Sequence, residues 1–402
     1  MSKKFLLISQ VFYPDQVSTA NLFTGLCSLL VEENIEVEAW SAHPSYTNFK
    51  RQPKRILYKG VNIIYLPSTN FNKSTIAGRS VNILTFMISA SLKLLFSKEK
   101  TPVWALTNPP FLGILLSHIC SLKKRKFIYI LLDIFPEGLV RLGKVSRLNI
   151  FIKLWQHLFV LTLKKSEVII VIGRDTEQFV VDICHECQDR IEYIPHWQDD
   201  DLIFPVAFDK NNFVTEKGLK ESFVVQYSGN IGIWNEVRTM GRAVKKNIEN
   251  VFFIFVGGGI KKPELLSEFE IKDQKNVLML PFQDNFDFNN TMAASHVHLV
   301  TLKQGLEGMA VPCKIYGILA AGRPVIALVP EHSEIANIVR EENCGLVVDP
   351  DDLDGLINAI TFLKDSDGIR RQMGQNGRNA FENKYTTRIA AKAYKKILDK
   401  VT

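Results

Sequence analysis

The chain has 402 residues, which is more than one ordinary hydrophobic core supports, so we expect two domains. Apolar residues make up 46% and charged residues 23% of the chain, a composition typical of a soluble globular protein. Six cysteines in this length do not suggest a disulfide scaffold. Cys184 and Cys187 have CxxC spacing, but no second pair is spaced for zinc, and we interpret both as ordinary thiols.

The net charge of +7 is unevenly distributed along the chain. Residues 39–132 contain fourteen lysines and arginines and one acidic residue, Glu99. Such a segment is either a solvated surface or a surface that attracts an anionic partner. We expect no nucleic-acid partner, because no recognised nucleic-acid motif accompanies the charge. Apolar residues beside lysines, as in 148–165, suit an interfacial helix on an anionic membrane, although the same stripe could pack into the core.

The first half of the chain alternates strand-like and helix-like segments. The N-terminus is basic and then apolar, but its apolar run is short and no cleavage site follows, so we interpret residues 4–12 as a strand rather than a signal peptide. Residues 21–34 have helical spacing. Further strands are predicted at 35–42, 61–67, 102–107, 126–133 and 168–173. No run reaches the roughly 20 apolar residues of a membrane span, since the most apolar candidate, 81–96, is interrupted by Lys93.

The second half repeats this rhythm from Phe223. Strands are predicted at 223–229, 251–259, 276–282, 296–302, 324–329 and 345–350. A helix is predicted at 236–249, and alternating strands and helices imply a parallel sheet with helices on both faces. The sequence therefore predicts an α/β protein with two doubly wound domains, 1–205 and 206–385, and a last helix, 386–402, that packs back on the first domain. Ligands of such sheets bind at the carboxyl ends of the strands.

Glycine-rich turns follow two of the predicted strands in the second half. YSGNIG, residues 227–232, precedes a helix, and VGGG, residues 256–259, follows the next strand. Such turns allow a phosphate to approach the backbone, although either could be a simple chain reversal. Neither is a G-x-G-x-x-G fingerprint and the chain has no Walker P-loop, which weakens NAD and ATP as ligands.

The stretch VPCKIYGILAAGRPVIAL, residues 311–328, predicts a short helix from Pro312 that stops at Gly322, followed by a buried strand. Lys314 lies in the first turn of that helix and Lys303 in the loop before it. Two lysines beside a helix N-terminus are suited to neutralise a diphosphate, although Lys314 could also lie in solvent. Glu307 in the same loop could accept hydrogen bonds from sugar hydroxyls.

Three residues of the first half also follow predicted strands. Asp133 ends the strand in ILLDIFPEG, where its carboxylate could orient an acceptor hydroxyl or act as a base. The alternative is that Asp133 caps the next helix. Glu137 lies one helical turn further, and His43 follows another strand, which makes both candidates for contact with an acceptor.

Together these motifs resemble the retaining glycosyltransferases of family 4, which have the GT-B fold of two Rossmann-like domains facing a central cleft. Residues 305–327 resemble the donor-binding segment, and the resemblance spans almost the whole chain. It is closest to the branch that assembles O-antigen, capsule and exopolysaccharide repeat units on a lipid carrier. The other matching motifs, in the order that the family shows, are FYPD, SAHPSY, LTNPP, LLDIFPEGLVRLG, YSGNIG, VGGG and LPF.

The resemblance implies that the C-terminal half binds a nucleotide sugar as co-substrate, with no metal or other cofactor. The base would lie near Phe282 and Gln283, and backbone groups and lysines would hold the diphosphate. The implied donor-binding residues are Gly229, Asn230, Ile231, Gly257, Phe282, Gln283, Lys303, Lys314 and Tyr316. The implied catalytic residues are Asp133 and Glu307, and the implied acceptor-binding residues are Ser18, His43 and Glu137.

The sequence departs from the family pattern at two places. The family usually has two glutamates eight positions apart, but here the second position is Gly317 and the first is Met309, with Glu307 two residues earlier. The usual arginine of the first phosphate loop is absent, and Asn230 stands nearest to it. The resemblance therefore implies that contact to the donor ribose through the second glutamate is lost.

The implied function is a retaining hexosyl or N-acetylhexosaminyl transferase. It would move an N-acetylated hexosamine or deoxyhexosamine from a UDP-sugar to a saccharide on an undecaprenyl-diphosphate-type lipid. We expect a cytoplasmic, peripheral enzyme on the inner membrane, with the basic segment 39–132 on the anionic membrane surface. The alternatives are the same chemistry on a soluble acceptor, a non-catalytic sugar-nucleotide-binding protein and a sugar-nucleotide epimerase.

Overall fold

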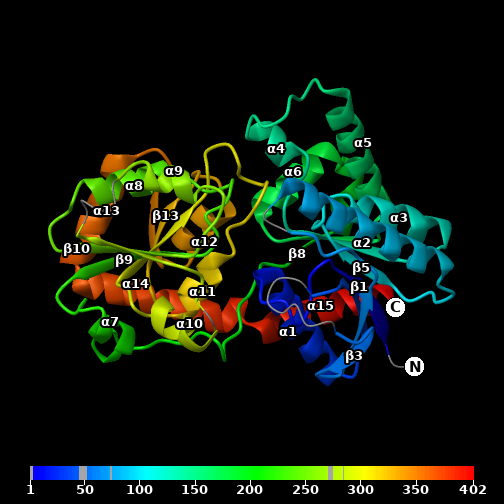
Figure 1. Ribbon diagram of the computed structural model, residues 1–402, viewed down its shortest axis with the longest axis horizontal. Helices are drawn as coiled ribbons and strands as arrows, with labels where there is room; N and C mark the ends of the chain where they lie inside the picture. The colour runs from blue at the N-terminus through cyan, green and yellow to red at the C-terminus, as the bar shows by residue number, and fades with distance from the viewer. Residues whose placement is uncertain (1–2, 45–51, 73–74, 270–274, 284) are drawn as a thin grey trace. The chain divides into compact units, whose positions relative to one another are not determined.

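The computed structural model describes residues 3–44, 52–72, 75–269, 275–283 and 285–402, and it divides into two compact units (Figure 1). The first unit comprises Met1–Pro195 and Thr387–Thr402, and the second comprises His196–Thr386. The second unit therefore starts at His196 rather than at the predicted residue 206, and the last helix of the chain belongs to the first unit.

The first unit is built on an eight-stranded sheet in the order β3–β4–β2–β1–β5–β6–β7–β8. All neighbouring strands are parallel except β3 and β4, which form an antiparallel pair at one edge. The strands β1, β5, β6 and β7 are almost continuously buried, as expected of parallel strands covered on both faces. The strands are β1 (Lys4–Ile8), β2 (Glu36–Ala42), β3 (Arg55–Tyr58), β4 (Val61–Leu66), β5 (Val103–Leu106), β6 (Phe127–Leu131), β7 (Val168–Val171) and β8 (Ile191–Tyr193).

Helices of the first unit pack beside one another in two groups (Figure 1). The last helix, α15, packs against α1, and its buried Tyr394 contacts the rings of Phe23 and Trp104. In the other group α2 packs against α3, and α3 packs against α5. The helices are α1 (Ser18–Glu32), α2 (Ile76–Phe96), α3 (Leu112–Leu122), α4 (Glu137–Arg141), α5 (Ile150–Lys165), α6 (Arg174–Ile183) and α15 (Thr387–Val401).

Helix α2 is longer than the sequence pattern indicated. It runs over 21 residues, and it is the one helix in the described part of the chain whose length and composition would allow it to cross a membrane. However, Asn82, Phe86, Ala90 and Leu94 form a stripe that is buried against the unit. A helix with one packed face belongs to the folded unit, and we interpret α2 as a surface helix.

The second unit is built on a six-stranded parallel sheet in the order β11–β10–β9–β12–β13–β14. The strands are β9 (Phe223–Ser228), β10 (Val251–Val256), β11 (Val277–Leu280), β12 (Val297–Thr301), β13 (Val325–Leu328) and β14 (Gly345–Val348). The helices are α7 (Asn212–Glu216), α8 (Arg238–Lys245), α9 (Lys262–Leu266), α10 (Asn285–Met292), α11 (Lys314–Ala320), α12 (Glu334–Glu341), α13 (Leu353–Asp365) and α14 (Asp367–Ala380). Helix α8 ends before the predicted residue 249, because Asn247 has a left-handed backbone with φ of 48°.

Cys184 and Cys187 form a disulfide, which corrects their interpretation as two thiols. Cys184 ends α6 and the next residues form a short 3₁₀ helix, His185–Arg190. This turn brings the two Cα atoms to 5.4 Å, within the range that a disulfide requires. Both side chains are buried.

Candidate functional site

Four neighbouring strands of the second unit end in loops that carry predicted site residues. Across the sheet these strands are β11, β10, β9 and β12. The loops after them carry Phe282, Gly257, Gly229 and Lys303, in that order. Since parallel strands place their carboxyl ends at one edge, residues that are distant in the sequence line up along that edge.

The glycine loops after β9 and β10 cross at very short distance. A Cβ on Gly257 would lie 2.2 Å from the carbonyl oxygen of Gly229, and Gly257 has φ of +125°. A Cβ on Gly259 would lie 2.4 Å from the Ile231 carbonyl oxygen. Only glycine fits such a contact at this backbone angle, so these turns do more than reverse the chain. Gly257 is buried by this contact, Gly229 and Gly258 are half-buried, and Gly259 is exposed at the carboxyl edge.

The backbone amides of the first loop are only partly available to a ligand. The N–H of Gly229 donates to the Val256 carbonyl at 2.9 Å, and the N–H of Ile231 donates to the Gly258 carbonyl at 2.8 Å. Ile231 is fully buried, whereas Asn230 between them is exposed. Gly229, Asn230 and Ile231 were predicted to hold the diphosphate through their backbone. Of these three residues only Asn230 is exposed, because the N–H groups of the other two are already used within the protein.

Lys314 begins α11 and points its ammonium group at the same edge. Its Nζ donates to the hydroxyl of Tyr227 and lies 3.9 Å from the centroid of the Tyr227 ring. The same Nζ lies 3.9 Å from the place that a Cβ on Gly229 would occupy. Burial lowers the pKa of Lys314 to about 7, because the site removes water from the ammonium group without supplying a carboxylate. A bound anion would supply that missing charge.

Lys303 follows β12 and adds a second cation. Its backbone N–H donates to the Trp234 carbonyl at 2.8 Å, which fixes the loop. Burial, followed by the nearby charge of Lys261, lowers the pKa of Lys303, while Glu264 and Glu236 act in the opposite direction. Lys261 itself is paired with Glu264. The edge therefore holds two lysines, Lys303 and Lys314, whose pKa values are both lowered by burial.

Phe282 supplies an exposed aromatic ring at the far end of this row. Its side chain is 61% exposed, which is unusual for phenylalanine, and a ring atom lies 3.3 Å from the Cβ position of Gly257. The neighbouring Gln283 donates from Nε2 to the Pro281 carbonyl at 2.9 Å. A flat apolar ring beside bare glycine backbone offers a stacking surface for a planar group.

Helix α11 differs from the prediction at its start and at Tyr316. The helix begins at Lys314 rather than at Pro312, and Gly322 ends it in the left-handed conformation with φ of +66°. Tyr316 is fully buried, with its ring 5.1 Å from that of Tyr385. We therefore correct its predicted role: Tyr316 packs in the core beneath the helix and offers no surface to a ligand.

The space beside Gly317 is filled by neighbouring side chains. A Cβ there would lie 3.2 Å from Cδ1 of Ile203 and 3.7 Å from Cε of Met292. Ile203 is itself fully buried. The same position lies 3.6 Å from Nε2 of Gln198, so the space that a glutamate would need is occupied by Ile203, Gln198 and Met292.

Glu307 lies in the loop between β12 and α11. Its side chain is half-buried, and its neighbours Leu306 and Met309 are buried. The N–H of Met309 donates to the Leu306 carbonyl at 3.0 Å, which forms a turn around Glu307. Met309, which stands where the family has its first glutamate, serves as a core residue, and the carboxylate of this loop is that of Glu307.

Asp133 lies at the carboxyl edge of the first unit, two residues after β6. Its backbone N–H and that of Leu132 both donate to Oγ1 of Thr107, at 3.1 and 3.0 Å. Thr107 follows the neighbouring strand β5. Burial raises the pKa of Asp133 to about 6. Helix α4 has Pro136 at its N-cap, so Asp133 is not a helix cap and is suited to proton transfer near neutral pH.

Ser18 and His43 lie in loops or helix starts after β1 and β2. Ser18 is the first residue of α1. His43 follows β2, its backbone N–H donates to Oγ of Ser68 at 3.3 Å, and its ring lies 5.4 Å from that of Tyr65. Because β2, β1, β5 and β6 are consecutive in the sheet, these residues share the edge on which Asp133 lies.

Glu137 does not share that environment. Its carboxylate is paired with Arg147, lies 3.8 Å from Nε of Arg141, and accepts a hydrogen bond from Nε2 of Gln156 at 2.9 Å. The side chain is buried. We therefore correct its predicted acceptor role: both carboxylate oxygens are used to join α4 to α5.

Two residues lie within the quoted motifs YSGNIG and LTNPP but were not predicted as site residues. Tyr227, the first residue of YSGNIG and the second-last of β9, orients Lys314. Thr107 holds the turn at Asp133 from the neighbouring strand. In the part of the chain that the structure describes, no group of three or more His, Cys, Asp or Glu residues is placed to hold a metal ion.

Comparison with known proteins agrees with this architecture. The solved structure of Alr3699/HepE from Anabaena in complex with UDP and glucose superposes with a TM-score of 0.76 at 13% identity, over 99% of this chain and 100% of that one. The structure of WaaG, a glycosyltransferase involved in lipopolysaccharide biosynthesis, superposes with a TM-score of 0.72 at 14% identity, over 99% of each chain. The chain therefore has the GT-B fold, with one parallel α/β sheet in each unit.

Sequence comparison is informative for the second unit. Residues 209–380 match the family Glycosyl transferases group 1, and this range lies within the second unit. The second unit is thus a group 1 glycosyl transferase domain, and the carboxyl edge described above belongs to it. The chain is also 26% identical over 334 residues to the probable glycosyltransferase WbjE of Pseudomonas aeruginosa, which covers 82% of this chain and 81% of WbjE.

Proposed function

We propose that the protein is a retaining glycosyltransferase that takes its sugar from a UDP-sugar. The observation that supports this most is the row of groups along the second unit's edge: the Phe282 ring, the crossed glycine backbones and the Lys314 ammonium group. This order matches a nucleotide, with a stacked base at one end and a diphosphate at the other. The HepE structure, which has the same fold, was solved with UDP and glucose.

The chemistry that we propose is stabilisation of a departing nucleoside diphosphate. When the bond between the sugar and the diphosphate breaks, negative charge develops on the leaving oxygen. The Lys314 side chain lies at the Gly229 loop, and Lys303 follows the neighbouring strand β12, so both could stabilise that charge in their protonated form. Asp133 would take part on the acceptor side by orienting or deprotonating a hydroxyl. We propose an N-acetylated hexosamine or deoxyhexosamine as the transferred sugar, transfer with retention, and no requirement for a metal.

The first experiment is to measure the melting temperature with UDP, GDP, ADP, TDP and NAD at matched millimolar concentrations. A ligand present at a hundred times its dissociation constant stabilises the folded protein by about 2.7 kcal/mol, which gives a clear shift. We expect a selective rise with UDP. A rise with another nucleotide would change the donor, and no rise with any of the five would contradict a preformed nucleotide site.

We propose further that the acceptor is a saccharide on a lipid diphosphate, because the first unit has an exposed apolar face. On α2, Val81, Leu84, Ile88, Leu92 and Leu95 are exposed at helical spacing, opposite the buried stripe. We call this stripe, with its continuation on α3 and α5, the apolar ridge. Its members on α3 and α5, or just before these helices, are Phe111, Leu115, Leu122, Leu148, Ile150, Phe151 and Leu154.

The position of the ridge suits the surface of a membrane. The three helices that carry it are neighbours (Figure 1), and the exposed Arg79, Lys98 and Lys153 lie within three residues of its members in the sequence. A helix surface that combines apolar and basic residues binds at the interface of an anionic bilayer. Segment 148–165, which was expected either at an interface or in the core, is divided: Ile152, Phe159 and Leu163 are buried, whereas the start of α5 is exposed. We propose a peripheral enzyme on the cytoplasmic face of the inner membrane.

The double variant Leu84→Ser/Ile88→Ser is expected to bind vesicles that contain anionic lipids about tenfold or more weakly, because two aliphatic side chains no longer enter the interface. Pelleting with such vesicles at increasing salt gives the measurement, and wild-type binding should weaken with salt. Leu57→Ser is the matched control, since Leu57 is 75% exposed on the edge strand β3. If the double variant and the control pellet equally, the ridge does not contact the membrane and the soluble acceptor is favoured.

A non-catalytic sugar-nucleotide-binding protein is the second candidate. It is favoured by Gly317, which stands where the resemblance predicts a glutamate and which is surrounded by Ile203, Gln198 and Met292. Such a protein would show the UDP shift but release no UDP from a UDP-sugar with any lipid-linked acceptor.

A further inference from the structure

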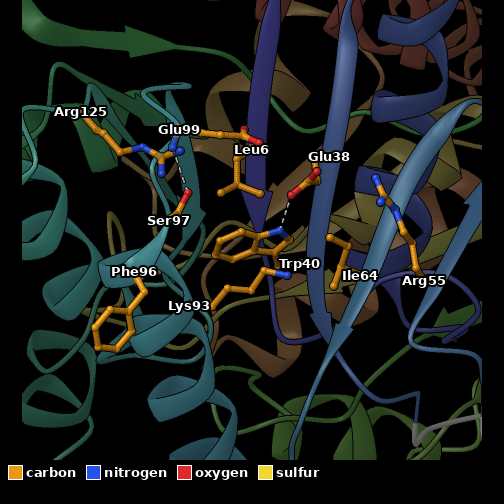
Figure 2. A pocket seen from close by; sticks show the side chains of 10 residues that line it. All are labelled: Leu6, Glu38, Trp40, Arg55, Ile64, Lys93, Phe96, Ser97, Glu99 and Arg125. Carbon is orange, nitrogen blue, oxygen red and sulfur yellow. Dashed lines mark hydrogen bonds between the residues drawn. The ribbon is translucent and has the colours of Figure 1, made fainter.

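A cavity of about 470 Å³ lies in the first unit between the C-terminal end of α2 and the strands β2 and β4 (Figure 2). Its size is within the range of sites for small ligands. It is lined by residues that precede or lie within the strands, such as Leu6, Glu38 and Arg125, and no residue of the acceptor edge contributes to it. The function proposed above therefore leaves this cavity unassigned.

Three cationic side chains line the cavity, and not all of their hydrogen-bond donors are used within the protein. Arg125 is 5% exposed; its Nε and Nη2 both donate to the Thr101 carbonyl, at 2.9 and 2.7 Å, whereas its buried Nη1 has no acceptor among the described residues. Lys93 forms no ion pair in the described part of the chain and lies with its Nζ 4.6 Å from the centroid of the Trp40 ring. Arg55 uses its Nε for Asn62 at 2.6 Å.

The two acids of the lining are already satisfied. Glu38 accepts from Nε1 of Trp40 at 2.6 Å and from Nδ2 of Asn62 at 3.0 Å. Glu99 is paired with Lys4 at 3.3 Å and accepts from Oγ1 of Thr101 at 3.2 Å. Figure 2 shows the Trp40 indole among the lining side chains, with a hydrogen bond to Glu38 and the Lys93 side chain beside its ring. Both oxygens of Glu38 are thus in use and Glu99 is ion-paired through Oε2, while the cations of the lining keep unused donors, which suit an anion.

The electrostatic surroundings favour the same conclusion. Burial lowers the pKa of Lys93, with Glu38 acting in the opposite direction, so the ammonium group lacks a full counter-charge. Lys98 and Lys100 flank Glu99 in the chain, Lys124 precedes Arg125, and all three are exposed. An anion at the cavity would thus sit in a positive field.

We propose that this cavity binds the phosphate group of an anionic phospholipid. The rim of the cavity indicates that the phosphate belongs to a lipid. Phe96 on this rim is 77% exposed, and it continues the apolar ridge through Leu95 and Leu92 on the same helix. A phosphate in the cavity would place the attached glycerol and acyl chains against that end of the ridge. This inference rests on the membrane attachment proposed above and names the headgroup contact within it.

A soluble short-chain lipid separates the cavity from the rest of the ridge. Dihexanoyl phosphatidylglycerol, kept below its critical micelle concentration, is titrated into the whole protein while tryptophan fluorescence is recorded, and Trp40→Phe identifies the signal of Trp40. We expect a saturable change that Lys93→Gln weakens about tenfold or more, the usual loss when a charged partner of a hydrogen bond is removed. Lys98→Gln is the control: it removes the same charge from an exposed position outside the cavity, and we expect about twofold or less.

Each other result overturns the proposal. Equal binding of dihexanoyl phosphatidylcholine would show that the cavity does not recognise the net negative charge of the lipid. Equal binding of inorganic phosphate would show that the cavity binds the free ion. No saturable change with any of the three, or an unchanged Lys93→Gln, would remove the site. The UDP-induced melting shift of Lys93→Gln serves as the folding control, since Lys93 and the nucleotide edge lie in different units. The headgroup contact can therefore fail while the proposed function stands.

Discussion

Replacing Lys314 with alanine is expected to weaken UDP binding by about 1.5–3 kcal/mol, the usual contribution of a hydrogen bond to a charged group. The loss should exceed that of any exposed lysine, because Lys314 is desolvated and fixed by Tyr227 beside the Gly229 loop. Titration calorimetry with UDP gives the measurement. Lys245→Ala removes an exposed lysine at the end of α8 and should bind UDP as the wild type does. Unchanged affinity in Lys314→Ala would place the diphosphate elsewhere.

The pH dependence of the same site follows from the lowered pKa of Lys314, about 7 against an ordinary 10.5. A bound diphosphate raises that pKa again, so binding takes up a proton. UDP should bind most tightly below pH 7 and more weakly above it, by at most about tenfold per pH unit. The UDP affinity of the Lys314→Met variant should not show this pH dependence.

Stability of the ligand-free protein should change in the opposite sense. The folded pKa of Lys314 lies below the unfolded one, so the unfolded chain binds more protons between about pH 7 and 10.5, and the free energy of unfolding rises with pH across that window. Lys314→Met removes the buried charge and should be more stable than the wild type at neutral pH. Weaker UDP binding in a more stable variant cannot be attributed to unfolding.

Much of the fold could be predicted from local sequence. Parallel strands buried on both faces are continuous apolar runs, and VIIV, FIYIL and VFFIFV were recognisable as such. β3 and β8 were missed because they are edge strands with half-exposed residues and no apolar run. The predicted first strand, 4–12, is shorter in the structure, since β1 ends at Ile8 and the apolar residues after it belong to the loop.

The site was predictable in position but not in detail. Because ligand loops follow strands, Phe282, Gly257, Gly229 and Lys303 could be identified from their place after apolar runs. Contacts between distant segments could not: the filling of the space at Gly317 by Ile203 depends on how the segment before the second sheet packs. Local pattern likewise gave no sign that Arg147 and Gln156 use both oxygens of Glu137.

Asp133→Asn is expected to lower turnover by about 10²–10⁴-fold while leaving UDP affinity near normal, because proton transfer to a positioned carboxylate contributes on that order and Asp133 lies in the first unit. The measurement is UDP release from UDP-N-acetylglucosamine with undecaprenyl-diphosphate-linked N-acetylglucosamine as acceptor. Asp182→Asn makes the same chemical change at an exposed position of α6 and should keep wild-type turnover.

The pH profile distinguishes a base from a merely structural carboxyl group. Burial raises the pKa of Asp133 to about 6 from 3.8, so its ionised form, and with it turnover, should rise as pH passes through about 6. The folded pKa lies above the unfolded one, so the folded state holds its proton more tightly, and the stability that this group contributes is lost as pH rises through about 6. Asp133→Asn should therefore be at least as stable as the wild type at pH 7, and its residual activity should lack the limb near pH 6. Wild-type turnover in the variant, or a limb that persists, would exclude Asp133 as the base and leave the acceptor hydroxyl to the departing diphosphate, whose lysines lie in the other unit.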